Sequence, residues 1–170
     1  GLVGCSCGGQ ICKCDATGQV NGNSDVGGLV GCDSGGKVST CYTTGQVNGT
    51  SDVGGLVGCN SGGTISNCYA TGQVNGTNNV GGLVGYSSSG TISNCYATGP
   101  VNETIEYGDL VGLGTCGTMN NVDAGWPVSS ADPRGGSDGR RGCSPPHHHN
   151  TTRLAPHPLT AASPAPSPTF

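Results

Sequence analysis

The sequence is poor in charged and aromatic residues. Of its 170 residues, 9% are charged, 4% are aromatic and 32% are hydrophobic. A helical bundle or an ordinary α/β enzyme needs long side chains at most positions of each element, so this composition excludes both classes. The net charge of -4 is too small for a chain kept disordered by charge repulsion. No apolar run approaches the roughly 20 residues of a membrane-spanning helix. We expect neither a membrane span nor a nucleic-acid partner.

Glycine is abundant, at 34 positions. Collagen needs glycine at every third position, whereas here it occurs in pairs and at other intervals. The glycines follow a longer period instead. The tetrapeptide Gly-Leu-Val-Gly begins at Gly1, Gly28, Gly55 and Gly82, and Asp-Leu-Val-Gly begins at Asp109. Each step is 27 residues without insertion, which is typical of the coils of a solenoid.

The apolar residues within one unit predict strands. In the third unit Leu56, Val57, Ile65, Val74 and Val80 do not form the stripe of an amphipathic helix, and glycine, threonine and asparagine separate them. We therefore predict an all-β chain whose residues 1–125 form a β-solenoid of about five 27-residue coils, with units starting at 1, 28, 55, 82 and 109. Residues 126–170, rich in proline, serine and histidine, are predicted to be an irregular tail or linker.

Eleven cysteines in so short a chain favour an oxidising compartment. Cys5 and Cys14 lie nine residues apart, and the next two units repeat that spacing. Cys7 and Cys12 nest inside the first pair, which is typical of antiparallel strands. We therefore predict disulfide staples within units. The predicted pairs are Cys5–Cys14, Cys7–Cys12, Cys32–Cys41, Cys59–Cys68 and, with the nearest available partner, Cys95–Cys116.

If Cys59 and Cys68 lie opposite each other on antiparallel strands, the same pairing extends to other residues of the third unit. It places Val57 opposite Ala70, and Gly58 opposite Tyr69, whose ring would cover the strand glycine.

The four thiols of the first unit could also bind zinc, but other units supply two each and no histidine precedes His147. We expect no metal or cofactor, while stacked free cysteines remain an alternative.

The run from Val53 to Gly72 and the one starting at Val80 resemble the GLUG repeat, which has a Gly-Leu-aliphatic-Gly core. The resemblance covers about residues 1–122. GLUG repeats occur in large secreted and cell-surface proteins, including bacterial adhesin-like proteins and the non-catalytic part of IgA-cleaving metallopeptidases. The resemblance implies an extracellular β-solenoid stalk or adhesive module without catalytic residues, and the zinc-peptidase sequence H-E-x-x-H is absent from the chain.

Asparagine recurs at one surface position of the repeat. Asn48, Asn75 and Asn102 each begin an Asn-x-Thr sequence, and Asn150 begins a further one in the tail. These four residues are predicted N-glycosylation sites if the chain passes through a eukaryotic secretory pathway. The alternative is that Asn-Gly-Thr simply forms a good turn.

Two other kinds of column recur with the repeat. An acidic column contains Asp25, Asp52, Asn79 and Glu106, for which we favour a solvated turn over calcium binding because the glycine-rich calcium nonapeptide is missing. Threonine columns are suggestive of ice binding by analogy with insect antifreeze proteins. Their members are Thr17, Thr44, Thr71 and Thr98 in one column, and Thr50, Thr77 and Thr104 in the other.

No nucleophile, base or phosphate-loop constellation is found in the sequence, so we expect a protein that is not an enzyme. The leading hypothesis is a secreted or cell-surface repeat module with an adhesive or structural role. Its partners would be a cell-surface or glycan ligand, or further copies joined end to end into filaments through exposed strand edges. The alternatives are an ice- or glycan-binding solenoid and an accessory segment of a larger surface enzyme.

Overall fold

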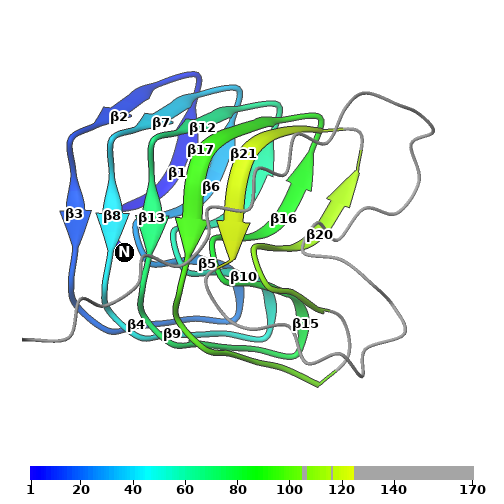
Figure 1. The fold of residues 1–170 in the computed structure, drawn as a ribbon. Helices are drawn as coiled ribbons and strands as arrows, with labels where there is room; N and C mark the ends of the chain where they lie inside the picture. Colours follow the sequence, from blue (N-terminus) through cyan, green and yellow to red (C-terminus); the bar gives the residue numbers. More distant parts are fainter. Residues whose placement is uncertain (105–106, 116, 125–170) are drawn as a thin grey trace, which may run out of the picture.

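The computed structural model of the chain describes residues 1–104, 107–115 and 117–124. These residues form strands and turns but no helix, and therefore no helix able to cross a membrane. Successive coils stack side by side into a β-solenoid of about four turns (Figure 1). The predicted all-β solenoid is confirmed, although five coils were expected. The predicted tail, residues 126–170, lies outside the described residues, so the domain division stays a prediction.

Each turn of the solenoid passes through four sheets in the same order. Sheet 1 contains β1 (Val3–Cys7), β6 (Val30–Ser34), β11 (Val57–Ser61), β16 (Val84–Ser88) and β20 (Val111–Thr115). Sheet 2 contains β2 (Gln10–Cys12), β7 (Lys37–Ser39), β12 (Thr64–Ser66), β17 (Thr91–Ala97), β21 (Thr118–Ala124), β3 (Asp15–Ala16), β8 (Tyr42–Thr43) and β13 (Tyr69–Ala70). Sheet 3 contains β4 (Val20–Asn21), β9 (Val47–Asn48), β14 (Val74–Asn75) and β18 (Val101–Asn102). Sheet 4 contains β5 (Ser24–Gly27), β10 (Ser51–Gly54), β15 (Asn78–Gly81) and β19 (Tyr107–Gly108).

The strand register follows directly from the 27-residue period. Val57 pairs with Val30 on one side and with Val84 on the other, and all named strand pairs of the described residues are parallel. Backbone hydrogen bonds continue this register through the turns, as from the Leu56 amide to the Leu83 carbonyl at 2.9 Å. Equivalent residues of successive units therefore become direct neighbours.

Two apolar clusters fill the interior. The larger one is built by sheets 1 and 2 and contains the stacked Leu29, Leu56 and Leu83, each fully buried. The smaller one consists of valines from sheets 3 and 4, such as Val53 and Val74. Burying one such side chain contributes about 1.5–3 kcal/mol, and the stacking repeats the contribution at each coil. The core is thin, but it is continuous along the solenoid.

The predicted pairing inside a unit is wrong. Val57 lies in sheet 1, whereas Ala70 lies in sheet 2 and pairs with Thr43 and Ala97. The predicted cover of Gly58 by Tyr69 is wrong as well, because a side chain at Gly58 would collide with the backbone of β5. The missing Cβ thus lets sheets 1 and 4 approach closely, which is a packing role that the hairpin interpretation did not anticipate.

The predicted disulfides are also absent from the described residues. The pairs Cys5–Cys14, Cys7–Cys12, Cys32–Cys41 and Cys59–Cys68 are all free thiols, and so is Cys95. The partner proposed for Cys95, Cys116, lies outside the described residues. The stacking explains the difference: Cys32 on sheet 1 has Cys59 as its strand neighbour, while Cys41 is buried in the core. Of the alternatives considered for these thiols, free cysteines stacked between coils describe this arrangement.

Candidate functional site: surface columns

The repeat converts each surface position into a column that runs along the solenoid. A column presents one chemical group at regular intervals, since neighbouring strands lie about 4.8 Å apart. The described residues contain columns of asparagine, tyrosine, hydroxyl groups, thiols and carboxylates, and these columns are the candidate functional surfaces.

The asparagine column is a ladder of side-chain hydrogen bonds on sheet 3. The Asn48 amide donates to Asn21 Oδ1 at 2.8 Å, the Asn75 amide donates to Asn48 Oδ1 at 2.7 Å, and the Asn102 amide donates to Asn75 Oδ1 at 2.9 Å. Glutamines two residues earlier support the ladder; Gln73 Nε2, for example, lies 3.1 Å from Asn75 Oδ1. These contacts hold the amides in one orientation along the solenoid.

Three predicted glycosylation sites, Asn48, Asn75 and Asn102, are members of this ladder. In each of them the side-chain nitrogen that would carry a glycan donates the ladder bond. Asn21 belongs to the ladder although it lacks the Asn-x-Thr sequence, and this was the signal for a structural role that sequence reasoning missed. Glycosylation stays a prediction, and Asn150 lies outside the described residues.

Three tyrosines form a stack on sheet 2. The ring centroids of Tyr42 and Tyr69 are 5.0 Å apart with an interplanar angle of 6°, and those of Tyr69 and Tyr96 are 5.0 Å apart at 3°. Tyr96 is 43% exposed, and Tyr42 and Tyr69 are half-buried. Asp15 and Asp123 occupy the equivalent positions before and after the stack.

Hydroxyl groups form further columns, two of which lie on sheet 2 with the tyrosine stack. Thr64 lies in register with Thr91, which in turn neighbours Thr118 on β21. A parallel row contains Ser39, Ser66 and Ser93. The predicted column of Thr17, Thr44, Thr71 and Thr98 is exposed throughout. In the column of Thr50, Thr77 and Thr104, Thr77 is half-buried and the other two are exposed.

The acidic column lies at one turn of each coil. Asp25, Asp52 and Asn79 all adopt the left-handed backbone conformation, with φ of 51°, 52° and 50°. Asn79 donates to Asp52 Oδ1 at 2.7 Å, and partial burial, reinforced by the Asp52 charge, raises the pKa of Asp25. The described residues contain no group of three or more potential ligands from histidine, cysteine, aspartate and glutamate placed to hold a metal. Glu106, the last predicted member, lies outside the described residues.

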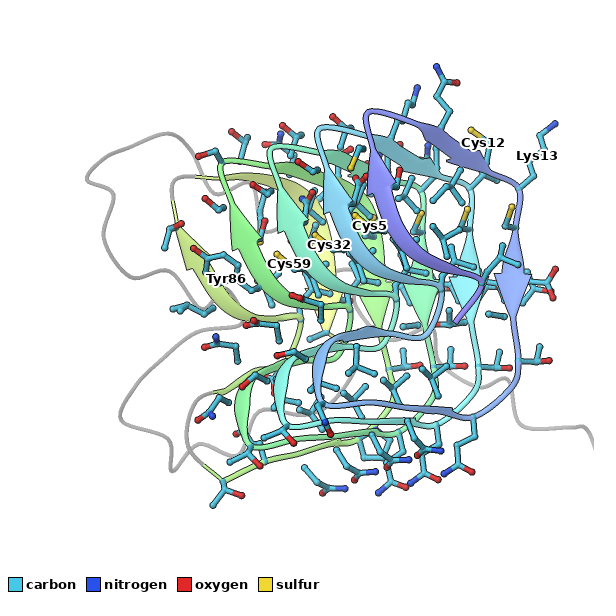
Figure 2. The ribbon with its side chains drawn as sticks, turned by 180° about the vertical axis from the view of Figure 1, so that it is seen from behind. Cys5, Cys12, Lys13, Cys32, Cys59 and Tyr86 are labelled. Atoms are coloured by element: carbon cyan, nitrogen blue, oxygen red, sulfur yellow. The ribbon has the colours of Figure 1, made fainter. Side chains whose placement is uncertain are left out.

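The thiols form two columns of different character. On sheet 1, Cys5, Cys32 and Cys59 lie in one row that continues with Tyr86 (Figure 2). Burial raises the pKa of Cys59 to about 12, with neighbouring Cys32 contributing in the same direction. A thiol with so high a pKa is a poor nucleophile at neutral pH.

The second thiol column is part of the core. Cys41, Cys68 and Cys95 are buried, and the backbone amides of Cys41 and Cys68 each donate to the sulfur one coil further along, at 3.4 Å. Burial raises the pKa of Cys41 to about 11. These cysteines therefore act as small apolar core residues that also accept hydrogen bonds.

Two segments, residues 49–75 and 76–102, match the family described as the GLUG motif. The first runs from the turn before β10 to the end of β14, so one GLUG motif makes one complete turn of the solenoid. The predicted resemblance is thereby confirmed for the two central units. Searches of curated proteins and of solved structures give no match to the chain.

Proposed function

We propose that this chain is a non-catalytic repeat module that acts outside the cell in an adhesive or structural role. The observation that carries the proposal is the in-register stacking of identical polar groups along the solenoid. Such columns offer the same contact at each coil instead of gathering different groups at one point. Contacts of this kind are individually weak but add up on a repetitive partner, as in multivalent binding.

The identity of the repeat supports the same proposal. The GLUG motifs occupy the centre of the solenoid, and the resemblance of this repeat to modules of secreted and cell-surface proteins favours an extracellular location. A repetitive partner of suitable chemistry is a polysaccharide or another cell-surface glycan, whose hydroxyl groups can hydrogen-bond to the exposed threonine column.

The full chain, coupled to beads, tests the adhesive role. We expect the beads to be retained on surfaces coated with insoluble polysaccharide such as β-glucan or chitin. Replacing Thr44, Thr71 and Thr98 by glutamate should reduce retention at least tenfold. The matched control places glutamate at Ser34 and Ser61, which are exposed on sheet 1, and should retain binding. Retention equal to that of beads without protein would contradict an adhesive role for these polysaccharides.

Ice binding is a second candidate, favoured by the hydroxyl rows of sheet 2. Thr64, Thr91 and Thr118 repeat at the strand spacing next to the serine row. The test is thermal hysteresis of the full chain, compared with a Thr91→Lys variant that interrupts the row. A difference between melting and freezing temperatures that Thr91→Lys abolishes would favour ice over glycan as the ligand. The absence of such a difference in the unsubstituted chain would rule out ice binding.

End-to-end assembly and an accessory role in a surface enzyme stay predictions. Sedimentation velocity over a concentration series tests end-to-end assembly.

A further inference from the structure

A carboxyl group is enclosed in the core of the second coil. Asp33 on β6 is 0% exposed, and neither of its carboxyl oxygens has a hydrogen-bond partner. Its equivalents in the neighbouring coils are Ser6, Asn60 and Ser87, which are buried but carry no charge. Asp33 is therefore the one ionisable member of a buried polar column among the described residues.

Asn60 shows what this position requires. Its Oδ1 accepts a hydrogen bond from the Gly63 amide at 3.0 Å, and its Nδ2 donates to the Gly63 carbonyl at 3.3 Å. The turn thus offers one donor and one acceptor to the side chain. An ionised aspartate only accepts, so Asp33 as a carboxylate has nothing to donate to the equivalent carbonyl of Gly36.

The packing brings Asp33 close to a second acceptor. The point where Gly63 would carry a Cβ lies in contact with Asp33 Oδ2 and 2.6 Å from Asn60 Oδ1. Both oxygens therefore crowd the same side of Gly63. Two acceptors without a shared proton repel each other, whereas a protonated carboxyl can donate to a neighbouring oxygen.

Within the part of the chain that the structure describes, no cation compensates the charge of Asp33. The elements packed around Asp33 present Ser6 and Cys7 from β1, Gly36 from the following turn, and Asn60 from β11. Cys7 is the titratable group among these, and the pKa of its thiol is raised mainly by the neighbouring Cys5, with a smaller contribution from Asp33. Lys37, at the start of β7, is exposed and makes no hydrogen bond to the carboxyl.

We infer that Asp33 is a proton-binding site, at which the folded chain holds the carboxyl in its neutral form and the solenoid gains stability on acidification. Burial raises the pKa of Asp33, while the nearby Ser6 hydroxyl and Gly36 amide lower it to a smaller extent. Neither group has hydrogen-bond geometry toward the carboxyl, so burial outweighs both.

The sign of the pH dependence follows from linkage. The folded pKa lies above the unfolded value of about 3.9, so the folded state binds more protons between these two values. The free energy of unfolding therefore falls as pH rises from about 4 through the folded pKa, and the contribution of Asp33 is constant above it. This direction is opposite to that of a carboxylate stabilised by a salt bridge.

The repeat offers reciprocal variants of the full chain as a test. Asp33→Asn should lower the unfolding equilibrium constant at pH 7 at least tenfold in urea, and should flatten the stability profile between pH 4 and 7. Asn60→Asp adds a second buried carboxyl and should have the opposite effects on both. An Asp33→Asn chain with the urea midpoint and pH profile of the unsubstituted chain would overturn the proposal.

A direct titration keeps the test decisive if Asn60→Asp does not fold. Carboxyl ¹³C shifts of the unsubstituted chain, assigned by their loss in Asp33→Asn, should show one aspartate that stays protonated to higher pH in the folded chain than the aspartates of the urea-unfolded chain do. A titration of Asp33 in the folded chain that coincides with its titration in the urea-unfolded chain would refute the inference.

Discussion

The side-chain amide of Asn75 donates a hydrogen bond to Oδ1 of Asn48 across 2.7 Å, although the two residues are 27 positions apart in the chain. That separation is one turn of the solenoid and also the length of one GLUG motif. Each motif therefore contributes one rung to every column. The stabilising contacts of a column join adjacent coils and recur with the period of the sequence. This arrangement leads to four predictions beyond the titration of Asp33.

The first prediction concerns the amide ladder. Asn75→Ala removes two ladder bonds, those to Asn48 and from Asn102, and the supporting bond from Gln73, whereas Asn102→Ala removes one bond at the exposed end. At about 0.5–1.5 kcal/mol for each bond, Asn75→Ala should destabilise the chain by about 1.5–4.5 kcal/mol and Asn102→Ala by about a third as much. Urea unfolding of the unglycosylated chain gives both values.

Thr77→Ala is the matched control for the ladder. It destroys the Asn-x-Thr sequence of Asn75 and leaves the amides in place. The stability of this variant should match that of the parent chain. Equal losses for Thr77→Ala and Asn75→Ala would mean that the ladder does not stabilise the fold.

The second prediction concerns the tyrosine stack. Tyr69 lies between two rings, so Tyr69→Leu removes both stacking contacts. Aromatic pairs contribute about 0.5–1.5 kcal/mol each, and we expect a loss of about 1–3 kcal/mol together with a weaker near-ultraviolet circular dichroism signal. Tyr86→Leu is the control, because Leu113 occupies the equivalent position one coil later. Similar losses for the two variants would argue against a specific contribution of the stack.

The third prediction concerns a strained threonine. Thr40 has φ of 56°, a left-handed conformation that is unfavourable for a β-branched residue, while Asn67 and Asn94 hold the same position in the next coils. Thr40→Asn should therefore raise the stability by about 1 kcal/mol, visible as a higher melting temperature. Thr44→Asn, at an exposed position with ordinary φ, should leave the melting temperature unchanged. A lower melting temperature for Thr40→Asn would contradict the strain argument.

The fourth prediction concerns thiol reactivity in the reduced, folded chain. Exposed Cys5, Cys7 and Cys12 should react with a maleimide before buried Cys68 and Cys95, as followed by peptide mass spectrometry. At Cys41, burial also keeps the thiol protonated, since a pKa of about 11 leaves a thiolate fraction of about one in a thousand at pH 8. Unfolding in urea should equalise the rates. Equal rates in the folded chain, or disulfides nine residues apart, would show that the described packing of the thiols is wrong.

The 27-residue period was enough to predict a solenoid, but it led to a wrong prediction of which strands and cysteines are neighbours. The constant spacing, as from Gly28 to Gly55, indicates that each repeat occupies an equivalent position in the fold, and the short segments of β-branched residues indicate strands. The nine-residue spacing of Cys32 and Cys41, however, is compatible both with a hairpin inside one unit and with two columns shared between units. No local feature of the sequence distinguishes these two arrangements, because in both of them each cysteine keeps the same position within its repeat.

The stacking of coils resolved that ambiguity through backbone hydrogen bonding. Most strands have two to five residues, and the chain turns into the next sheet after each short run. Strands of one unit therefore do not lie side by side, and their amides are satisfied by the equivalent strand of the adjacent coil. The coil length, the all-β class and the surface columns are thus encoded in the order of residues. The direction of pairing, the split between exposed and buried thiols, and the enclosure of Asp33 arise only when whole turns pack against each other, because burial belongs to the stack and not to any single repeat.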